Sequence, residues 1–159
     1  MTAGATSPTM PAVGSPAPDF TLPSTAGTDV TLSSLRGKNV LIAFFPHAFT
    51  STCTTELLCF TEDFGAFRVA DTVVLPVSVD SIPTLREFKA KEGISVELLS
   101  DFKREVSRRY GTLLEEKFHT NRSYLLIDRN GIVRWTYAED TPKTRRENSE
   151  LLERIRALS

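Results

Sequence analysis

A change of hydrophobic period at Pro46 constrains the fold more than any other feature of this sequence. Residues 40–45 (V-L-I-A-F-F) form a continuous apolar run of strand length, which is typical of a strand buried on both faces. Beyond the proline, large apolar side chains recur at helical spacing, and they are Leu57, Phe60, Phe64 and Phe67. This stripe predicts a helix over residues 52–69. A buried strand followed directly by an amphipathic helix indicates an α/β fold.

The other segments continue the alternation of strands and helices. Further strands are predicted at residues 19–22, 29–32, 73–79, 96–99, 123–128 and 132–137. Further helices are predicted at residues 83–92, 103–110 and 144–158. Strand–helix–strand units give parallel pairs, and the Asn130-Gly131 turn adds an antiparallel hairpin. The predicted class is therefore α/β with a thioredoxin-like fold, in which a mixed central sheet is flanked by helices on both sides.

Length and composition indicate one domain behind a short leader. The chain has 159 residues, of which 40% are hydrophobic and 25% are charged, as expected for one globular domain. Residues 1–11 are small and polar or contain proline, with little to bury. We therefore expect a disordered leader at 1–11 and the domain at 12–159.

Charge and hydropathy argue against two classes of partner. The formal net charge of -1 is unlike that of a dedicated nucleic-acid binder, and no apolar run approaches the ~18 residues that span a bilayer. The N-terminal segment lacks the basic and apolar regions of a secretory signal, so a cytoplasmic protein is expected. Two cysteines and two histidines are too few and too scattered for a zinc site. No metal and no cofactor are expected.

Cys53 is the residue placed best for chemistry. It lies in the first turn of the helix that follows the buried strand, where unpaired N–H groups and the helix dipole favour a thiolate. It also precedes Leu57 by four residues, so it shares the apolar stripe of that helix. A buried cysteine that acts only as a small hydrophobe is the commoner alternative.

The residues around Cys53 resemble a known motif. Pro46, Thr50 and Cys53 form P-x-x-x-T-x-x-C within F-F-P-H-A-F-T-S-T-C-T-T-E-L (44–57). This pattern, with the entry V-G-S-P-A-P-D-F (13–20), resembles the peroxiredoxins. The likeness is strongest to the one-cysteine alkyl hydroperoxide reductase E branch, with the bacterioferritin-comigratory type as the nearest alternative. It extends from the entry segment to the tail helix.

The resemblance implies a thiol peroxidase and a role for each motif residue. Cys53 would attack a peroxide oxygen and become a sulfenic acid. The Thr50 hydroxyl would reach the same pocket, although Thr50 could equally act as a helix N-cap. Pro46, which has no N–H, would keep the pocket floor free of competing donors while also ending the strand.

Two charged residues complete the set that the resemblance implies. Arg122 precedes the strand S-Y-L-L-I-D (123–128), where the family places its active-site arginine. Its guanidinium would stabilise the thiolate and the charge that develops on the leaving oxygen. Glu56, three residues after Cys53, would orient Arg122 through a carboxylate–guanidinium contact. Simple complementation of the helix dipole explains an acidic residue there equally well.

Cys59 invites a second role as a resolving cysteine. It lies six residues after Cys53, a separation of ~240° and ~9 Å in one helix, whereas a disulfide needs Cα atoms within about 7 Å. Related small peroxiredoxins with a helical resolving partner often place it five residues on. We therefore favour a semi-buried thiol at Cys59 over a resolving residue.

The leading hypothesis is a peroxidase that reduces hydrogen peroxide or organic hydroperoxides and is recycled by an external thiol. The reductant would be thioredoxin, a glutaredoxin-like protein or a low-molecular-weight thiol, and the resemblance implies a homodimer. The alternative is a non-catalytic thioredoxin-like redox sensor or interaction protein, which would need neither Thr50 nor Arg122. A Cys–His hydrolase based on His47 or His119 is disfavoured, as is a disulfide reductase, because C-x-x-C is absent.

Overall fold

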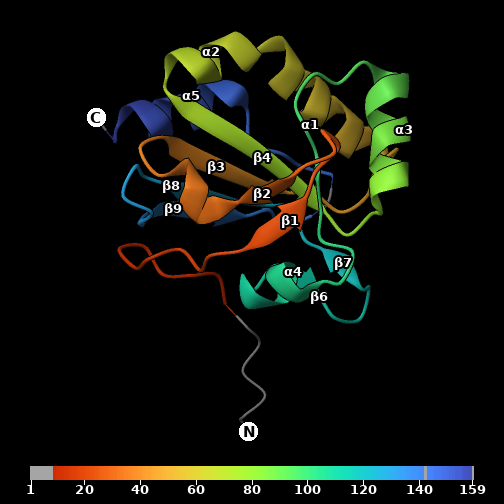
Figure 1. The fold of residues 1–159 in the computed structure, drawn as a ribbon, viewed down its shortest axis with the longest axis horizontal. Coiled ribbons are helices and arrows are strands. Elements are labelled where there is room, and N and C mark those ends of the chain that lie inside the picture. The colour runs from red at the N-terminus through yellow and green to blue at the C-terminus, as the bar shows by residue number, and fades with distance from the viewer. Residues whose placement is uncertain (1–8, 142, 159) are drawn as a thin grey trace, which may run out of the picture.

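The computed structural model describes residues 9–141 and 143–158, which form a mixed five-stranded sheet with helices on both faces (Figure 1). The strand order is β5-β4-β3-β8-β9. These strands are β3 (Asn39–Phe44), β4 (Thr72–Ser78), β5 (Leu99–Ser100), β8 (Ser123–Ile127) and β9 (Val133–Ala138). β3 runs parallel to β4 and antiparallel to β8, so the sheet is mixed as predicted.

Alternation along β3 divides the core into two clusters. Leu41 and Ala43 face a cluster that includes residues of α1, α2, α3 and α5, which Figure 1 shows around one side of the sheet. Ile42 and Phe44 face the N-terminal strands and α4, on the opposite side. The helices are α1 (Ser51–Glu62), α2 (Phe64–Val69), α3 (Ile82–Glu92), α4 (Glu105–Arg109) and α5 (Asn148–Arg156). The prediction of a thioredoxin-like sheet covered on both faces is confirmed.

Short strands lie outside the main sheet. β1 (Thr21–Pro23) and β2 (Asp29–Thr31) pair antiparallel as predicted, and a 3-10 turn (Leu32–Leu35) follows them. β6 (Leu113–Leu114) and β7 (His119–Thr120) form a small hairpin that the sequence patterns did not predict, because strands of two residues carry no periodicity.

The predicted helix 52–69 is wrong as one continuous helix, because it breaks at Asp63 into α1 and α2. The Asn148 side chain donates to the Cys59 carbonyl at 2.8 Å and to the Asp63 carboxylate at 2.9 Å. Both contacts lie at the junction of the two helices, where the Asp63 N–H also keeps its bond to the Cys59 carbonyl at 3.1 Å. Phe64 consequently leaves the buried stripe and is 41% exposed.

Several predicted boundaries move. The predicted strand at 96–99 becomes β5 at Leu99–Ser100, where it pairs with β4, and the tail helix is shorter than 144–158. Of the expected leader, residues 1–8 lie outside the described residues, and Met10 packs against the second core cluster. Within the described part of the chain, no helix has the length and hydropathy to cross a membrane.

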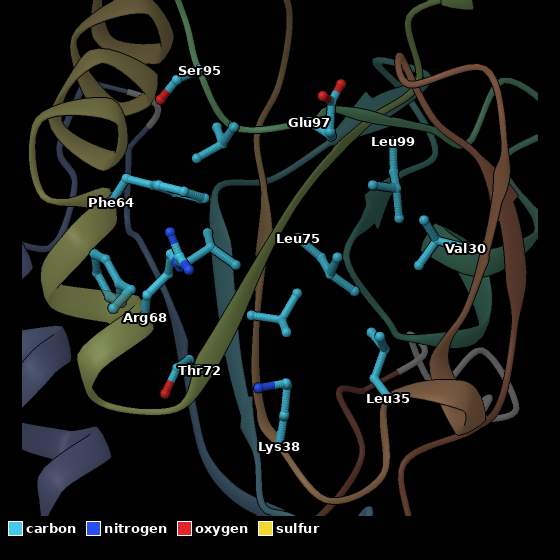
Figure 2. A pocket seen from close by; sticks show the side chains of 14 residues that line it. Val30, Leu35, Lys38, Phe64, Arg68, Thr72, Leu75, Ser95, Glu97 and Leu99 are labelled. Carbon is cyan, nitrogen blue, oxygen red and sulfur yellow. The ribbon is translucent and has the colours of Figure 1, made fainter.

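The outer edge of β4 is left open along part of its length. Among the described residues, β5 pairs with β4 only at Val77 and Ser78, so Pro76 has β3 on one side and no described strand on the other. The odd-numbered carbonyls of β4 accept from β3, as Phe45 N–H to Val77 O shows, so Pro76 directs its missing donor toward the open edge. A groove of about 550 Å³ lies along this edge, between Phe64 and Arg68 on α2 and Leu35 beyond β2 (Figure 2).

Candidate active site

Cys53 lies in the first turn of α1, close behind β3. Thr50 is the N-cap of α1, and its backbone carbonyl accepts from Thr54 N–H, so the sulfur follows the helix start by three residues. Leu57 and Phe60 continue the inward face of the helix. Cys53 belongs to the same core cluster and is 1% exposed. The site is therefore a sheltered sulfur at the positive end of a helix.

Arg122 comes to this sulfur because β8 begins where β3 ends. The two strands are antiparallel with Phe44 opposite Ser123, so the residue before β8 lies beside the β3–α1 connection. The Nη2 group of Arg122 donates to Cys53 Sγ at 3.0 Å, and the side chain is 1% exposed. A guanidinium held against a sulfur in a buried site stabilises negative charge on that sulfur.

Glu56 is the second partner of the guanidinium. Its Oε1 accepts from Arg122 Nη1 at 2.5 Å, and the two side chains are 2% and 1% exposed. Burial raises the pKa of Glu56, while Arg122 and the Tyr124 hydroxyl act against that rise. Burial also opposes the charge on Arg122, but Glu56 and Cys53 outweigh it and raise the pKa of the guanidinium. Arg122 is therefore a fixed cation between a carboxylate and a sulfur.

Tyr124 extends this network, although the motif around Cys53 did not predict it. Its hydroxyl donates to Glu56 Oε2 and accepts from the Arg146 backbone N–H at 3.0 Å. Burial, followed by the nearby Glu56 charge, raises the pKa of Tyr124, so the phenol keeps its proton. Tyr124 lies two residues after Arg122, and strand alternation places both on one face. That period was the signal that could have identified it.

Thr50 and Pro46 lie between β3 and the body of α1, and within the described residues neither has a hydrogen bond to the sulfur. The Thr50 side chain makes no capping hydrogen bond; its hydroxyl donates to the His47 carbonyl at 2.8 Å, and the residue is exposed. Pro46 is buried and lies two residues after the end of β3. Within the described residues, the hydrogen bond to Cys53 Sγ comes from Arg122. The oxygen lone pairs of Thr50 therefore stay available at the helix start.

Cys59 lies away from this network, near the end of α1. It is a free, partly buried thiol whose carbonyl is bound by Asn148, and burial raises its pKa. His47 and His119 meet edge to face, with ring centroids 4.5 Å apart. His47 Nδ1 faces Asp80 at 3.8 Å, which exceeds hydrogen-bond length. Among the described residues the hydrogen bond to Cys53 Sγ comes from Arg122 and not from a histidine, so the nucleophile–base pair of a Cys–His hydrolase is not formed there.

Comparisons with known proteins agree with this geometry. Residues 13–136 match the model of the AhpC/TSA family. The chain is 38% identical over 152 residues to peroxiredoxin 2 of Thermoplasma acidophilum, covering 92% of this chain and 75% of the relative. It is 40% identical over 126 residues to alkyl hydroperoxide reductase E of Mycobacterium bovis, covering 77% and 82%. The reduced 2-Cys peroxiredoxin of Plasmodium vivax superposes with a TM-score of 0.86 at 31% identity, covering 93% and 82%.

A buried cysteine and arginine on a thioredoxin-like fold, together with these matches, define a thiol-dependent peroxidase. The chain belongs to the AhpC/TSA family and is a peroxiredoxin. Within the peroxiredoxins it is of the alkyl hydroperoxide reductase E type. This settles the choice between enzyme and non-catalytic redox sensor in favour of the enzyme.

Replacing Glu56 by glutamine should destabilise the protein while making the Cys53 thiolate easier to form. Removal of one member of a buried ion pair should lower the free energy of unfolding by about 3 kcal/mol. The sulfur would then be the remaining anionic partner of Arg122, so the midpoint of its thiolate absorbance titration should move to lower pH. Asp128→Asn, which disrupts a carboxylate–Arg134 pair beyond the far end of β8, is the control and should leave that midpoint unchanged. An upward shift in Glu56→Gln would show that Glu56 acts mainly by holding Arg122 in place.

Proposed function

We propose that Cys53 is the peroxidatic nucleophile and that Arg122 is the cation that keeps it reactive. The observation that carries this assignment is the 3.0 Å contact between Arg122 Nη2 and Cys53 Sγ, made by two side chains that are each 1% exposed. Cys53 also lies in the first turn of α1, where the helix dipole favours an anionic sulfur. Arginine side chains are rarely buried this completely unless they are paired with an anionic group.

The proposed reaction is a nucleophilic displacement at a peroxide oxygen. The Cys53 thiolate attacks one oxygen of the hydroperoxide, an S–O bond forms, and the O–O bond breaks. The leaving oxygen takes the electron pair and a proton from the solvent and departs as water or an alcohol, which leaves a sulfenic acid on Cys53. Arg122, which donates to the sulfur, would stabilise the charge that moves onto the leaving oxygen.

Three neighbouring residues complete the proposed site. The exposed Thr50 hydroxyl donates to the His47 carbonyl, which leaves its lone pairs to accept a hydrogen bond from the peroxide. Pro46 offers no N–H at the end of β3. Glu56 fixes the orientation of Arg122 through the Nη1 contact, with Tyr124 behind it.

For recycling, we propose an external thiol rather than Cys59. A first thiol condenses with the sulfenic acid, releasing water, and a second thiol reduces the mixed disulfide. Cys53 and Cys59 both lie within α1, separated by ~9 Å along the helix axis and ~240° around it. Forming their disulfide would unwind the helix and break the Asn148 contact to the Cys59 carbonyl. The raised pKa of Cys59 also keeps it a neutral thiol, which is the poor nucleophile.

The test is oxidation by stoichiometric hydrogen peroxide, followed by mass spectrometry. We expect dimedone to label Cys53 and peptide mapping to find no disulfide between Cys53 and Cys59. Added thiol should then convert the single turnover into sustained peroxide consumption, and Cys59→Ser should sustain it equally well. A Cys53–Cys59 disulfide as the main product would instead make Cys59 the resolving residue.

Compartment and assembly complete the proposal. Both cysteines are free thiols, which supports a reducing, cytoplasmic compartment.

The proposed assembly is a homodimer. Phe102 and Phe118 are 60% and 54% exposed, and the Arg104 guanidinium lies over both rings, 4.0 Å from the centroid of Phe118. An exposed aromatic patch of this kind supports self-association, which sedimentation equilibrium measures directly.

A further inference from the structure

The loop between Pro46 and Thr50 is held in a demanding conformation next to the sulfur. Phe49 has a φ of 67°, which lies in the left-handed region that residues other than glycine rarely adopt. Such a residue persists only where its surroundings fix it, at a cost on the order of 1–3 kcal/mol. The Phe49 ring packs against Phe88 of α3, with centroids 5.0 Å apart.

The backbone of this loop is fixed by Asp80. The Ala48 N–H donates to Asp80 Oδ2 at 2.8 Å, one residue before the strained Phe49. β3 and β4 are parallel neighbours, so the segments that follow them lie together at the carboxyl ends of these two strands. This topology brings a carboxylate just beyond β4 to the loop just beyond β3.

Asp80 is itself held from two further sides. Its Oδ2 also accepts from the Ser78 hydroxyl at 2.7 Å, and its carbonyl accepts from the Ser100 hydroxyl at 2.6 Å. The side chain is only 16% exposed. A carboxylate restrained in this way is a rigid acceptor for the Ala48 N–H.

We propose that Asp80 is a positioning residue for the peroxidase reaction. By holding Ala48, it fixes Phe49 in the left-handed region and thereby sets the position of the Thr50 hydroxyl relative to Cys53. This inference rests on the proposed function of Cys53 and Thr50. The effective group is the hydrogen-bond acceptor, because the other carboxylate oxygen lies 3.8 Å from His47, beyond hydrogen-bond length.

The experiment compares Asp80→Ala with Asp80→Asn. Because Ala48 is buried, alanine leaves an unpaired N–H that the loop must move to satisfy. Displacements of about 1 Å can cost up to ~10²-fold in rate, so the second-order rate constant for Cys53 with hydrogen peroxide should fall at least about tenfold. Asparagine keeps an acceptor and should stay within about threefold of wild type. The thiolate absorbance midpoint should be unchanged in both, since Arg122 reaches the sulfur from β8.

Asp128→Ala is the matched control. Asp128 is 14% exposed and accepts two backbone N–H groups in the β8–β9 turn, so its loss should lower stability without slowing peroxide reduction. If Asp80→Ala does not fold, Asp80→Ser replaces it, because the hydroxyl is polar but too short to reach Ala48.

Two results would overturn the inference. One is a folded Asp80→Ala or Asp80→Ser variant that reacts at the wild-type rate. The other is an Asp80→Asn variant as slow as alanine, which would assign the effect to charge rather than to the hydrogen bond. Failure of the underlying proposal looks different, because the wild-type protein would then consume peroxide without oxidation of Cys53.

Discussion

Cys53→Ser should reduce hydroperoxide consumption to the level of a protein-free control. Serine has nearly the shape of cysteine, but its hydroxyl stays protonated at neutral pH and is a far weaker nucleophile. The buried Arg122–Glu56 pair should remain in place, because Glu56 still neutralises the guanidinium. Circular dichroism should therefore show a folded protein, while peroxide remaining after mixing, measured colorimetrically, reports the activity.

The internal control is Cys59→Ser, which removes the other thiol from the same helix. It should retain stoichiometric oxidation of Cys53 at the wild-type rate. If Cys53→Ser consumed peroxide as fast as the native protein, the nucleophile would lie elsewhere and the assignment of the site would be wrong.

Arg122→Met should produce the second largest loss. It removes the cation at 3.0 Å from the sulfur while keeping a side chain that fills the space. The thiolate absorbance midpoint should move to higher pH, and loss of the transition-state donor should slow peroxide attack by roughly 10²–10³-fold. Arg122→Lys should restore the midpoint but only part of the rate, because an ammonium is a point charge that lacks the rigid, planar arrangement of donors of a guanidinium.

Arg129→Met serves as the control, because Arg129 is 57% exposed and pairs with Asp71 on the surface. Its rate and midpoint should match wild type. An unchanged midpoint in a folded Arg122→Met variant would remove Arg122 from the site.

The architecture was predictable from the sequence because its strands and helices have strong, distinct periods. The apolar runs 40–45 and 73–79 and the hairpin around Asn130-Gly131 predicted four of the five sheet strands with nearly correct bounds. The break at Asp63 was not predictable, because the apolar stripe runs through it to Phe67 and the Asn148 contact at the break comes from 85 residues away in the chain. A local hydrophobic pattern carries no information about such a contact.

The site was predictable to a similar depth. Cys53, Arg122 and Glu56 followed from a motif and its resemblance, and the structure brings these three together. Their roles in the reaction remain the proposals tested above. Tyr124 and Asp80 were missed, since each acts through a partner distant in sequence: Glu56 for the first and Ala48 for the second. Strand alternation from Arg122 offered a signal for Tyr124, whereas no pattern in the sequence connects Asp80 with Ala48.

Pro76 has a consequence for how copies of this chain behave toward one another. The open edge of β4 is a surface on which a strand of another molecule could grow, and exposed edges of this kind seed aggregation. A proline without a donor interrupts the row of hydrogen bonds at that edge. An incoming strand could therefore pair with β4 only over the few residues before Pro76. Pro76 therefore limits the length of β4 to which a strand of another copy could add.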